Sequence, residues 1–267
     1  MMTAEAVRER DILCHPGIMT TILSGWLCGR PTAGARCMDS KVVSKEIRGR
    51  VWPVLKENGF ARFTTRSAWR YSDSTIDVLN FQSFNSYHAS VMRVTPFSFV
   101  VNLGSFLTYV PPELSPEPTD GHLTPSEPEC HFRGSLAPTI KQAREAPRGV
   151  WSVEKKGKNL AGCIEDVVQQ LPQAMAWFGR LADKREVLRI LREDGEDMTA
   201  LWRFGRNPSP LRSRLTGYVA LELKCHDLAV EKLGEAAASD LFADLPSKRN
   251  GAVARNPQFK RSQHDEG

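Results

Sequence analysis

The most catalytic-looking cluster in the sequence is Cys130 with His131 and Arg133. A cysteine nucleophile acts as a thiolate and needs a base, usually a histidine, whose ring faces the sulfur. Adjacent residues on a strand point to opposite faces, so Cys130 and His131 do not form such a pair on extended backbone. His131 and Arg133 share a face there, which keeps open an alternative, a small enzyme of an unrecognised class. We assign no catalytic residue.

Cations alternate with aromatic side chains in the run 60–71. On one continuous strand, the period of two places Arg62, Arg66 and Arg70 on one face and the aromatic rings on the other. Guanidinium groups bind carboxylates and phosphates through paired N–H donors. The spacing therefore predicts a cationic surface for an acidic partner. The simpler interpretation is a solvated face with surface ion pairs, each worth little energy.

Two amides extend this predicted surface, Gln82 and Asn102. They could pair across neighbouring strands, which in the simpler interpretation is a hydrogen bond that stabilises the sheet. Gly104 indicates a bulge or a close backbone approach. An RNA-binding sheet needs exposed aromatic rings, and here the rings alternate to the apolar face. The predicted binding residues are Arg62, Arg66, Arg70, Gln82, Asn102 and Arg133.

Several widespread catalytic motifs are absent from the sequence. It contains no GxGxxG, GxxxxGK[ST], HExxH or GxSxG pattern, which disfavours dinucleotide enzymes, P-loop enzymes, zincins and serine hydrolases. The six cysteines are scattered and form no CxxC pair, as is typical of reduced thiols in a cytosolic protein. We therefore expect no metal and no cofactor.

The elements that position these side chains follow from the hydrophobic spacing. Asp39 and Ser40 are N-cap types, and the apolar spacing after them predicts a helix over 40–57, with a local bend because Pro53 lies inside it. Strand-like runs joined by short turns predict an antiparallel meander. These runs are 60–71, 75–84 and 97–107, with shorter strands near 130–136 and 149–154.

Proline marks a segment of a different kind at 110–129, which holds six prolines interleaved with acidic residues. Proline fixes φ and removes a backbone donor, so this segment is predicted to be an exposed, extended loop. After Leu160, apolar residues at helical spacing predict several helices, one capped by Asp183 and another by Ser209. Together the elements predict an α+β fold, with an antiparallel sheet of four to five strands packed against the N-terminal helix and C-terminal helices.

An ordered set of short matches resembles a bacterial family, domain of unknown function 4304. These matches are Lys56–Phe60, Trp69-Arg70, Asn80–Gln82 and Phe99–Gly104, with Cys130–Arg133 and Trp151 similar to later positions. Members run from a helix through a GF pair to a Trp-bearing strand, an xQ strand and an FxVNLG strand. The resemblance covers about 38–155 and implies the fold. It implies no activity, because the family has none to transfer. The long Pro-rich loop departs from the compact pattern.

The composition sets the domain organisation. The chain has 267 residues, 25% of them charged, and a net charge of +5. The uncharged run 12–29 contains His15 and Pro16 and suits neither a membrane span nor a secretory signal. We expect a weakly structured extension or an upstream-start artefact at 1–37, a core domain at 38–155, a helical region at 156–245 and a disordered basic tail at 246–267.

The function that these patterns favour is a non-enzymatic cytoplasmic module that binds an acidic protein through the cationic sheet face. No membrane partner is expected, and the oligomeric state stays open. The alternatives are a nucleic-acid accessory protein, because the chain has a pI near 8.9 and a basic tail, and the small enzyme described above.

Overall fold

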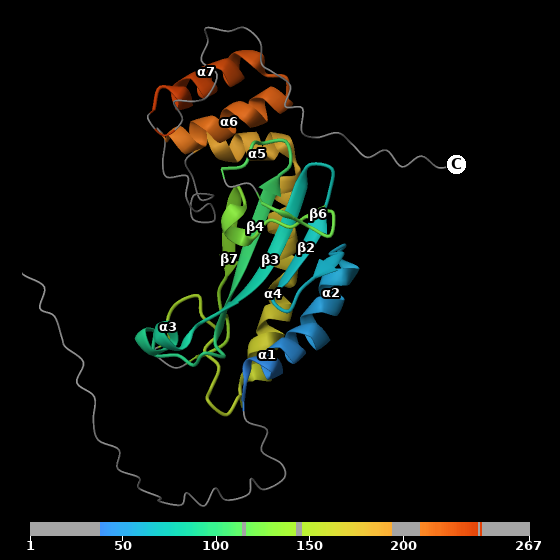
Figure 1. Cartoon of the computed structure of the whole chain (residues 1–267), viewed down its shortest axis with the longest axis vertical. Coiled ribbons are helices and arrows are strands. Elements are labelled where there is room, and N and C mark those ends of the chain that lie inside the picture. The colour runs from blue at the N-terminus through green and yellow to red at the C-terminus, as the bar shows by residue number, and fades with distance from the viewer. Residues whose placement is uncertain (1–37, 114–115, 143–145, 194–208, 240, 242–267) are drawn as a thin grey trace, which may run out of the picture. The chain divides into compact units, whose positions relative to one another are not determined.

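The structure is a computed structural model that describes residues 38–113, 116–142, 146–193, 209–239 and 241. The predicted extension at 1–37 and the predicted tail at 246–267 lie outside the described residues. Among the helices described, none has both the length and the apolar character that a bilayer crossing requires. Figure 1 shows the curved main sheet with helices along one face and at one end.

The sheet is antiparallel and has five strands in the order β1-β2-β3-β4-β7. Their bounds are Arg62–Phe63, Ser67–Tyr71, Thr75–Ser83, Phe99–Leu107 and Phe132–Leu136. The α+β prediction with four to five strands is confirmed. The predicted strand at 149–154 is wrong, because only Trp151 forms a bridge there, to Phe99.

The run 60–71 is not one strand, and this prediction is wrong. It forms β1 and β2, joined by a tight turn in which Thr64 N–H donates to the Ser67 carbonyl at 2.8 Å. The Thr64 hydroxyl oxygen also accepts from the Ser67 N–H at 3.0 Å. The Thr64 side chain thus stabilises this turn through its own hydrogen bond, although the turn lacks the glycine or asparagine that most turns contain.

The predicted helix at 40–57 is present as three consecutive pieces. They are α1 (Ser40–Glu46), a π-helical turn η1 (Ile47–Val51) and α2 (Trp52–Glu57). Asp39 is the N-cap and accepts from the Val42 N–H at 2.9 Å. The π-turn ends two residues before Pro53, which lies in the first turn of α2, where its missing N–H is tolerated. The predicted bend is this π-turn.

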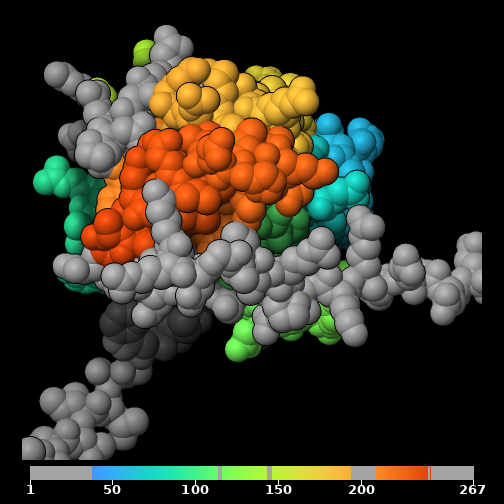
Figure 2. Space-filling model, turned by 90° about the horizontal axis from the view of Figure 1, so that it is seen from above, coloured from blue at the N-terminus to red at the C-terminus, as the bar shows by residue number. Residues whose placement is uncertain are grey.

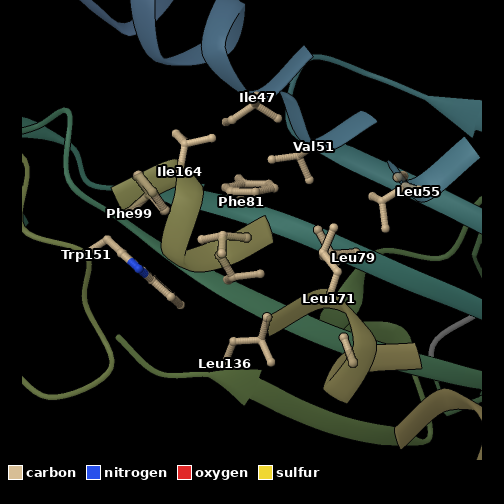
Figure 3. Close-up of a cluster of buried hydrophobic side chains, with 14 of the residues drawn as sticks. Ile47, Val51, Leu55, Leu79, Phe81, Phe99, Leu136, Trp151, Ile164 and Leu171 are labelled. Atoms are coloured by element: carbon tan, nitrogen blue, oxygen red, sulfur yellow. The ribbon is translucent and has the colours of Figure 1, made fainter. Parts of the chain in front are cut away.

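The main core lies between this helical segment, one face of the sheet and the long helix α4 (Leu160–Ala182). Figure 3 shows Ile47, Val51 and Leu55 directed at Phe81 and Leu79. The rings of Phe99 and Trp151 stack at 5.6 Å between centroids. The Trp151 indole N–H donates to the buried Asp166 carboxylate of α4 at 2.8 Å, which fixes Trp151 to the core.

The opposite face of the sheet is partly covered by the Pro-rich segment. This segment contains a small hairpin, β5 (Pro118–Thr119) and β6 (His122–Leu123), and a 3-10 turn η2 (Glu127–Glu129). Its backbone carbonyls accept from the Trp69 indole N–H and the Tyr71 hydroxyl, at 2.8 and 3.1 Å. The hairpin tip is exposed as predicted. Glu127 is buried, however, so the segment is in part a packed layer and not simply a loop.

The C-terminal helices continue from α4. They are α5 (Lys184–Arg192), α6 (Pro210–Glu222) and α7 (His226–Ala237). The caps predicted at Asp183 and Ser209 are both present. The buried Arg212 guanidinium donates to three carbonyls at the end of α5, where the helix dipole favours a cation. In Figure 2, viewed from above, α6 and α7 (orange to red) lie side by side at this end.

Candidate functional site

The strand register separates the predicted arginine cluster. Arg62 lies opposite Trp69, and Arg70 lies opposite Asp77 on the neighbouring strand. Directly opposite residues share a face, while Trp69 and Arg70 are adjacent and point to opposite faces. Arg62 and Arg70 are therefore on different faces of the sheet. The prediction of one face for all three arginines is wrong, because the turn at Thr64 reverses the chain between them.

Arg70 lies on the helix-covered face. Its Nε and Nη2 donate to one Asp77 carboxylate oxygen at 2.9 and 2.8 Å, and its guanidinium lies over the rings of Phe60 and Phe178 at 5.4 and 5.5 Å. Asp77 is only 2% exposed and also accepts from the Ser105 hydroxyl at 3.1 Å. Burial raises the pKa of Asp77, although Arg70 opposes this shift. Arg70 is thus the counterion of an internal carboxylate.

Arg66 follows the turn and reaches toward α1. Its Nη2 lies 3.4 Å from the Ser40 carbonyl, and its Nη1 is buried without a hydrogen-bond partner. Burial lowers the pKa of the Arg66 guanidinium. Because it points toward the helical segment, Arg66 does not join Arg62 in one surface.

The two arginines on the other face are neutralised by the Pro-rich segment. Arg62 pairs with Asp120 at 2.6 Å. Arg133 donates from Nε and Nη2 to the two oxygens of buried Glu127, at 2.5 and 3.1 Å. The acidic groups that bind these two arginines are therefore Asp120 and Glu127 of the same chain.

The amide interpretation is confirmed. Asn102 Nδ2 donates to Gln82 Oε1 at 2.9 Å across β3 and β4. Asn102 belongs to a polar row in which Ser67, Asn80, Asn102 and Ser135 lie opposite one another on four strands. Gly104 is in regular register, so it marks no bulge. A Cβ there would lie 2.6 Å from Cys130 Sγ, so the predicted close approach is made by a side chain.

The Cys130 and His131 side chains both have structural partners. Cys130 is buried and its Sγ donates to the Ser126 carbonyl at 3.4 Å. Burial, reinforced by the nearby Glu127 charge, raises the pKa of this thiol, so the thiolate is disfavoured. His131 Nδ1 accepts from the Leu107 N–H at 2.9 Å. This arrangement gives no observation in favour of the enzyme alternative. In the described part of the chain, no three His, Cys, Asp or Glu side chains gather to hold a metal.

A different group of cations is exposed and forms no ion pair among the described residues. We call it the basic end, and its members come from the loop after the short helix α3 (Ser86–Val91) and from the described parts of 139–159. Glu154 is the only acidic residue in those described parts. The basic end consists of Arg93, Lys141, Arg148, Lys155, Lys156 and Lys158.

Side-chain hydrogen bonds hold the two loops of the basic end together. The Thr95 hydroxyl donates to the Val153 carbonyl at 2.7 Å, and the Val153 N–H donates to the Ser98 hydroxyl at 3.0 Å. Arg93 and Lys155 each lie two residues from this junction, so their backbones are at most ~20 Å apart even if both connections are fully extended. This group was not predicted from the sequence, although residues 78–112 contain no Asp or Glu and 154–158 reads Glu-Lys-Lys-Gly-Lys.

Residues 51–180 match the model of the DUF4304 family. This family is described only as a domain of unknown function, and the match confirms the resemblance found in the sequence. The DUF4304 segment begins at the last residue of η1 and ends in α4, so it contains the sheet and the basic end but not α5 to α7. No curated protein and no solved structure matches the chain.

Proposed function

We propose that the chain is a protein-interaction module that binds an acidic partner at the basic end. The observation that carries the proposal is the contrast between two sets of cations. Arg62, Arg70 and Arg133 have carboxylate partners within the fold, whereas the six cations of the basic end have none among the described residues. The binding surface thus shifts from the arginine face to the end of the sheet at α3.

Charge of one sign on an ordered surface favours binding of the opposite sign. Clustered cations attract an acidic partner during encounter and select against basic partners. Side-chain hydrogen bonds hold the described parts of 139–159, which carry five of the six cations, in a fixed conformation. Gln142 bonds the Val150 carbonyl and the Ser152 N–H, at 2.9 and 2.7 Å, and Asn159 bonds the Ser152 carbonyl at 2.7 Å. A rigid loop loses little conformational entropy when a partner binds.

The environments of Cys130 and His131 favour a binding function over catalysis. Cys130 is buried with a raised pKa, and His131 accepts a backbone hydrogen bond. Gln82 lies exposed two strand positions before the α3 connection, so it adjoins the basic end and stays in the proposed surface. Asn102 orients it through their hydrogen bond.

The test compares two charge reversals of equal size in the full chain. The variant K155E/K156E changes the basic end, and the control R185E/K224E changes two exposed cations at the opposite end of the sheet. Binding of a fluorescent polyglutamate peptide is followed by anisotropy at low and high salt. We expect the first variant to bind at least tenfold more weakly and the control to stay within about twofold, since the interaction is local at a Debye length of ~10 Å.

Two outcomes would reject the proposal. Equal weakening by both variants would show that only the net charge matters. Tighter binding of an oligothymidylate than of polyglutamate, with the same dependence on Lys155 and Lys156, would favour the nucleic-acid alternative, for which log affinity falls steeply with log salt.

A further inference from the structure

Two large apolar side chains stand exposed on one face of α3. Tyr87 is 72% exposed and Val91 is 65% exposed. They are four residues apart, which on a helix places them side by side. Figure 1 shows α3 beyond the ends of β3 and β4, at the opposite end of the sheet from α5. Single exposed apolar residues are ordinary, but an adjacent pair that includes a tyrosine resembles the centre of a binding interface.

The position of α3 does not depend on these two side chains. Asn85 caps the helix by accepting from the His88 N–H at 2.8 Å. Ala89 is the buried residue of the helix, and its carbonyl accepts from the Val94 N–H at 2.9 Å. The fold therefore holds α3 in place through its other face, and Tyr87 and Val91 are left for contacts outside the described fold.

The charge around the pair indicates what it contacts. His88 lies next to Tyr87, and Arg93 follows Val91 by two residues. No Asp or Glu occurs between Asp77 and Glu113, so the part of β3 after Asp77 and all of β4 contain no acidic residue. A partner that covers Tyr87 and Val91 therefore meets cations at its margin and no carboxylate from residues 78–112.

We propose that α3 is the apolar anchor of the basic end. Its partner is an acidic polypeptide segment with an aliphatic or aromatic side chain, which packs over Tyr87 and Val91 while its carboxylates face Arg93 and the lysines of 154–158. This inference rests on the proposed function, and it adds that the acidic partner must also carry an apolar side chain. Tyrosines in such positions commonly carry a large share of the binding energy.

The experiment uses the full chain and two acidic peptides of equal length and charge. One contains only Glu, Ala and Gly. In the other, two alanines four residues apart are replaced by leucine. We expect the leucine peptide to bind about tenfold more tightly, as burial of a few apolar groups allows. The variant Y87S/V91S should remove this gain and leave binding of the alanine peptide within about twofold.

The matched control is V230S, which changes an exposed valine on α7. It should keep the full gain from leucine, and K155E/K156E should weaken both peptides alike. Thermal unfolding of Y87S/V91S should be unchanged, because both side chains are exposed.

Each contrary result has its own meaning. If the alanine peptide binds but leucine adds nothing, or if Y87S/V91S keeps the gain, the anchor is rejected and the proposed function stands. If neither peptide binds, both proposals fail. If Y87S/V91S weakens binding only to phosphatidylserine vesicles, the exposed pair contacts a membrane surface and the anchor proposal is overturned.

Discussion

The buried pair of Arg70 and Asp77 gives the strongest prediction about stability. The substitution Arg70→Met keeps an unbranched chain between Phe60 and Phe178 but removes the charge and both donors to Asp77. Asp77 is 2% exposed, and the Arg70 side chain is 24% exposed, so water replaces the lost donors poorly. Removal of one partner from a buried ion pair costs about 3–5 kcal/mol, because the other charge is left uncompensated.

The loss should depend on pH in a defined direction. Burial raises the pKa of Asp77 above its unfolded value, so the folded protein favours the protonated acid. The stability gained from that form is present below the unfolded pKa and is lost as the pH rises through the folded pKa. Without Arg70 the folded pKa rises further. The free-energy loss of R70M should therefore be largest near pH 8 and shrink by up to ~1.4 kcal/mol per pH unit once Asp77 protonates.

Urea unfolding followed by tryptophan fluorescence measures the difference between R70M and the parent at each pH. The matched control is R62M, because Arg62 pairs with Asp120, whose side chain is 83% exposed. A surface pair of this kind contributes about 0–1 kcal/mol, with little pH dependence. Our reasoning is refuted if R70M costs no more than R62M, or if its cost is the same at pH 5 as at pH 8.

Two further predictions test the packing. Gly104→Ala should lower the free energy of unfolding by ~1–3 kcal/mol, because the new Cβ would lie 2.6 Å from Cys130 Sγ. The control is Gly179→Ala in α4, where the new Cβ would meet no neighbouring side chain within 4 Å, and it should raise the free energy of unfolding by ~0.5–1 kcal/mol. Similar effects of the two substitutions would contradict the close approach at Gly104. Iodoacetamide near pH 8 should modify exposed Cys225, while buried Cys130 and Cys163 should react only in denaturant. Burial raises the pKa of both buried thiols, that of Cys163 to about 11, so little reactive thiolate forms. Peptide mass spectrometry measures the labelling rates, and equal labelling of Cys130 and Cys225 would contradict the prediction.

Strand periodicity predicted most of the sheet because the central strands are long. β3 and β4 pair along nine residues each, and both are rich in the β-branched and aromatic residues that favour strands. The amide pair of Asn102 and Gln82 followed from the placement of both residues on neighbouring strands. The turn within 60–71 could not be found in the same way, since its residues Thr64 and Thr65 are strand formers and no glycine, proline, asparagine or aspartate occurs between Arg62 and Arg70.

The carboxylate partners of the arginines could not be predicted from the local sequence. Arg62 and its partner Asp120 are 58 residues apart in the chain, and only the path of the Pro-rich segment over the sheet brings them together. The same path buries Glu127 against Arg133. The cations of the basic end were visible in the sequence, but that they lack acidic partners among the described residues is a property of the tertiary structure.

The π-turn at Ile47–Val51 also determines how the length of the first helical segment can change. Val43, Ile47, Val51 and Leu55 recur every four residues, and all four are fully buried. In a regular α-helix such a repeat rotates away from the core by about 40° at each step, and the wider turn cancels part of that rotation. If one residue were deleted from 47–51 and the segment closed to a regular α-helix, eleven helical steps of about 100° would separate Val43 from Leu55, which is close to three full turns, so Leu55 would keep its face. The π-turn is therefore the place in this helical segment where the loss of one residue would disturb the buried face least.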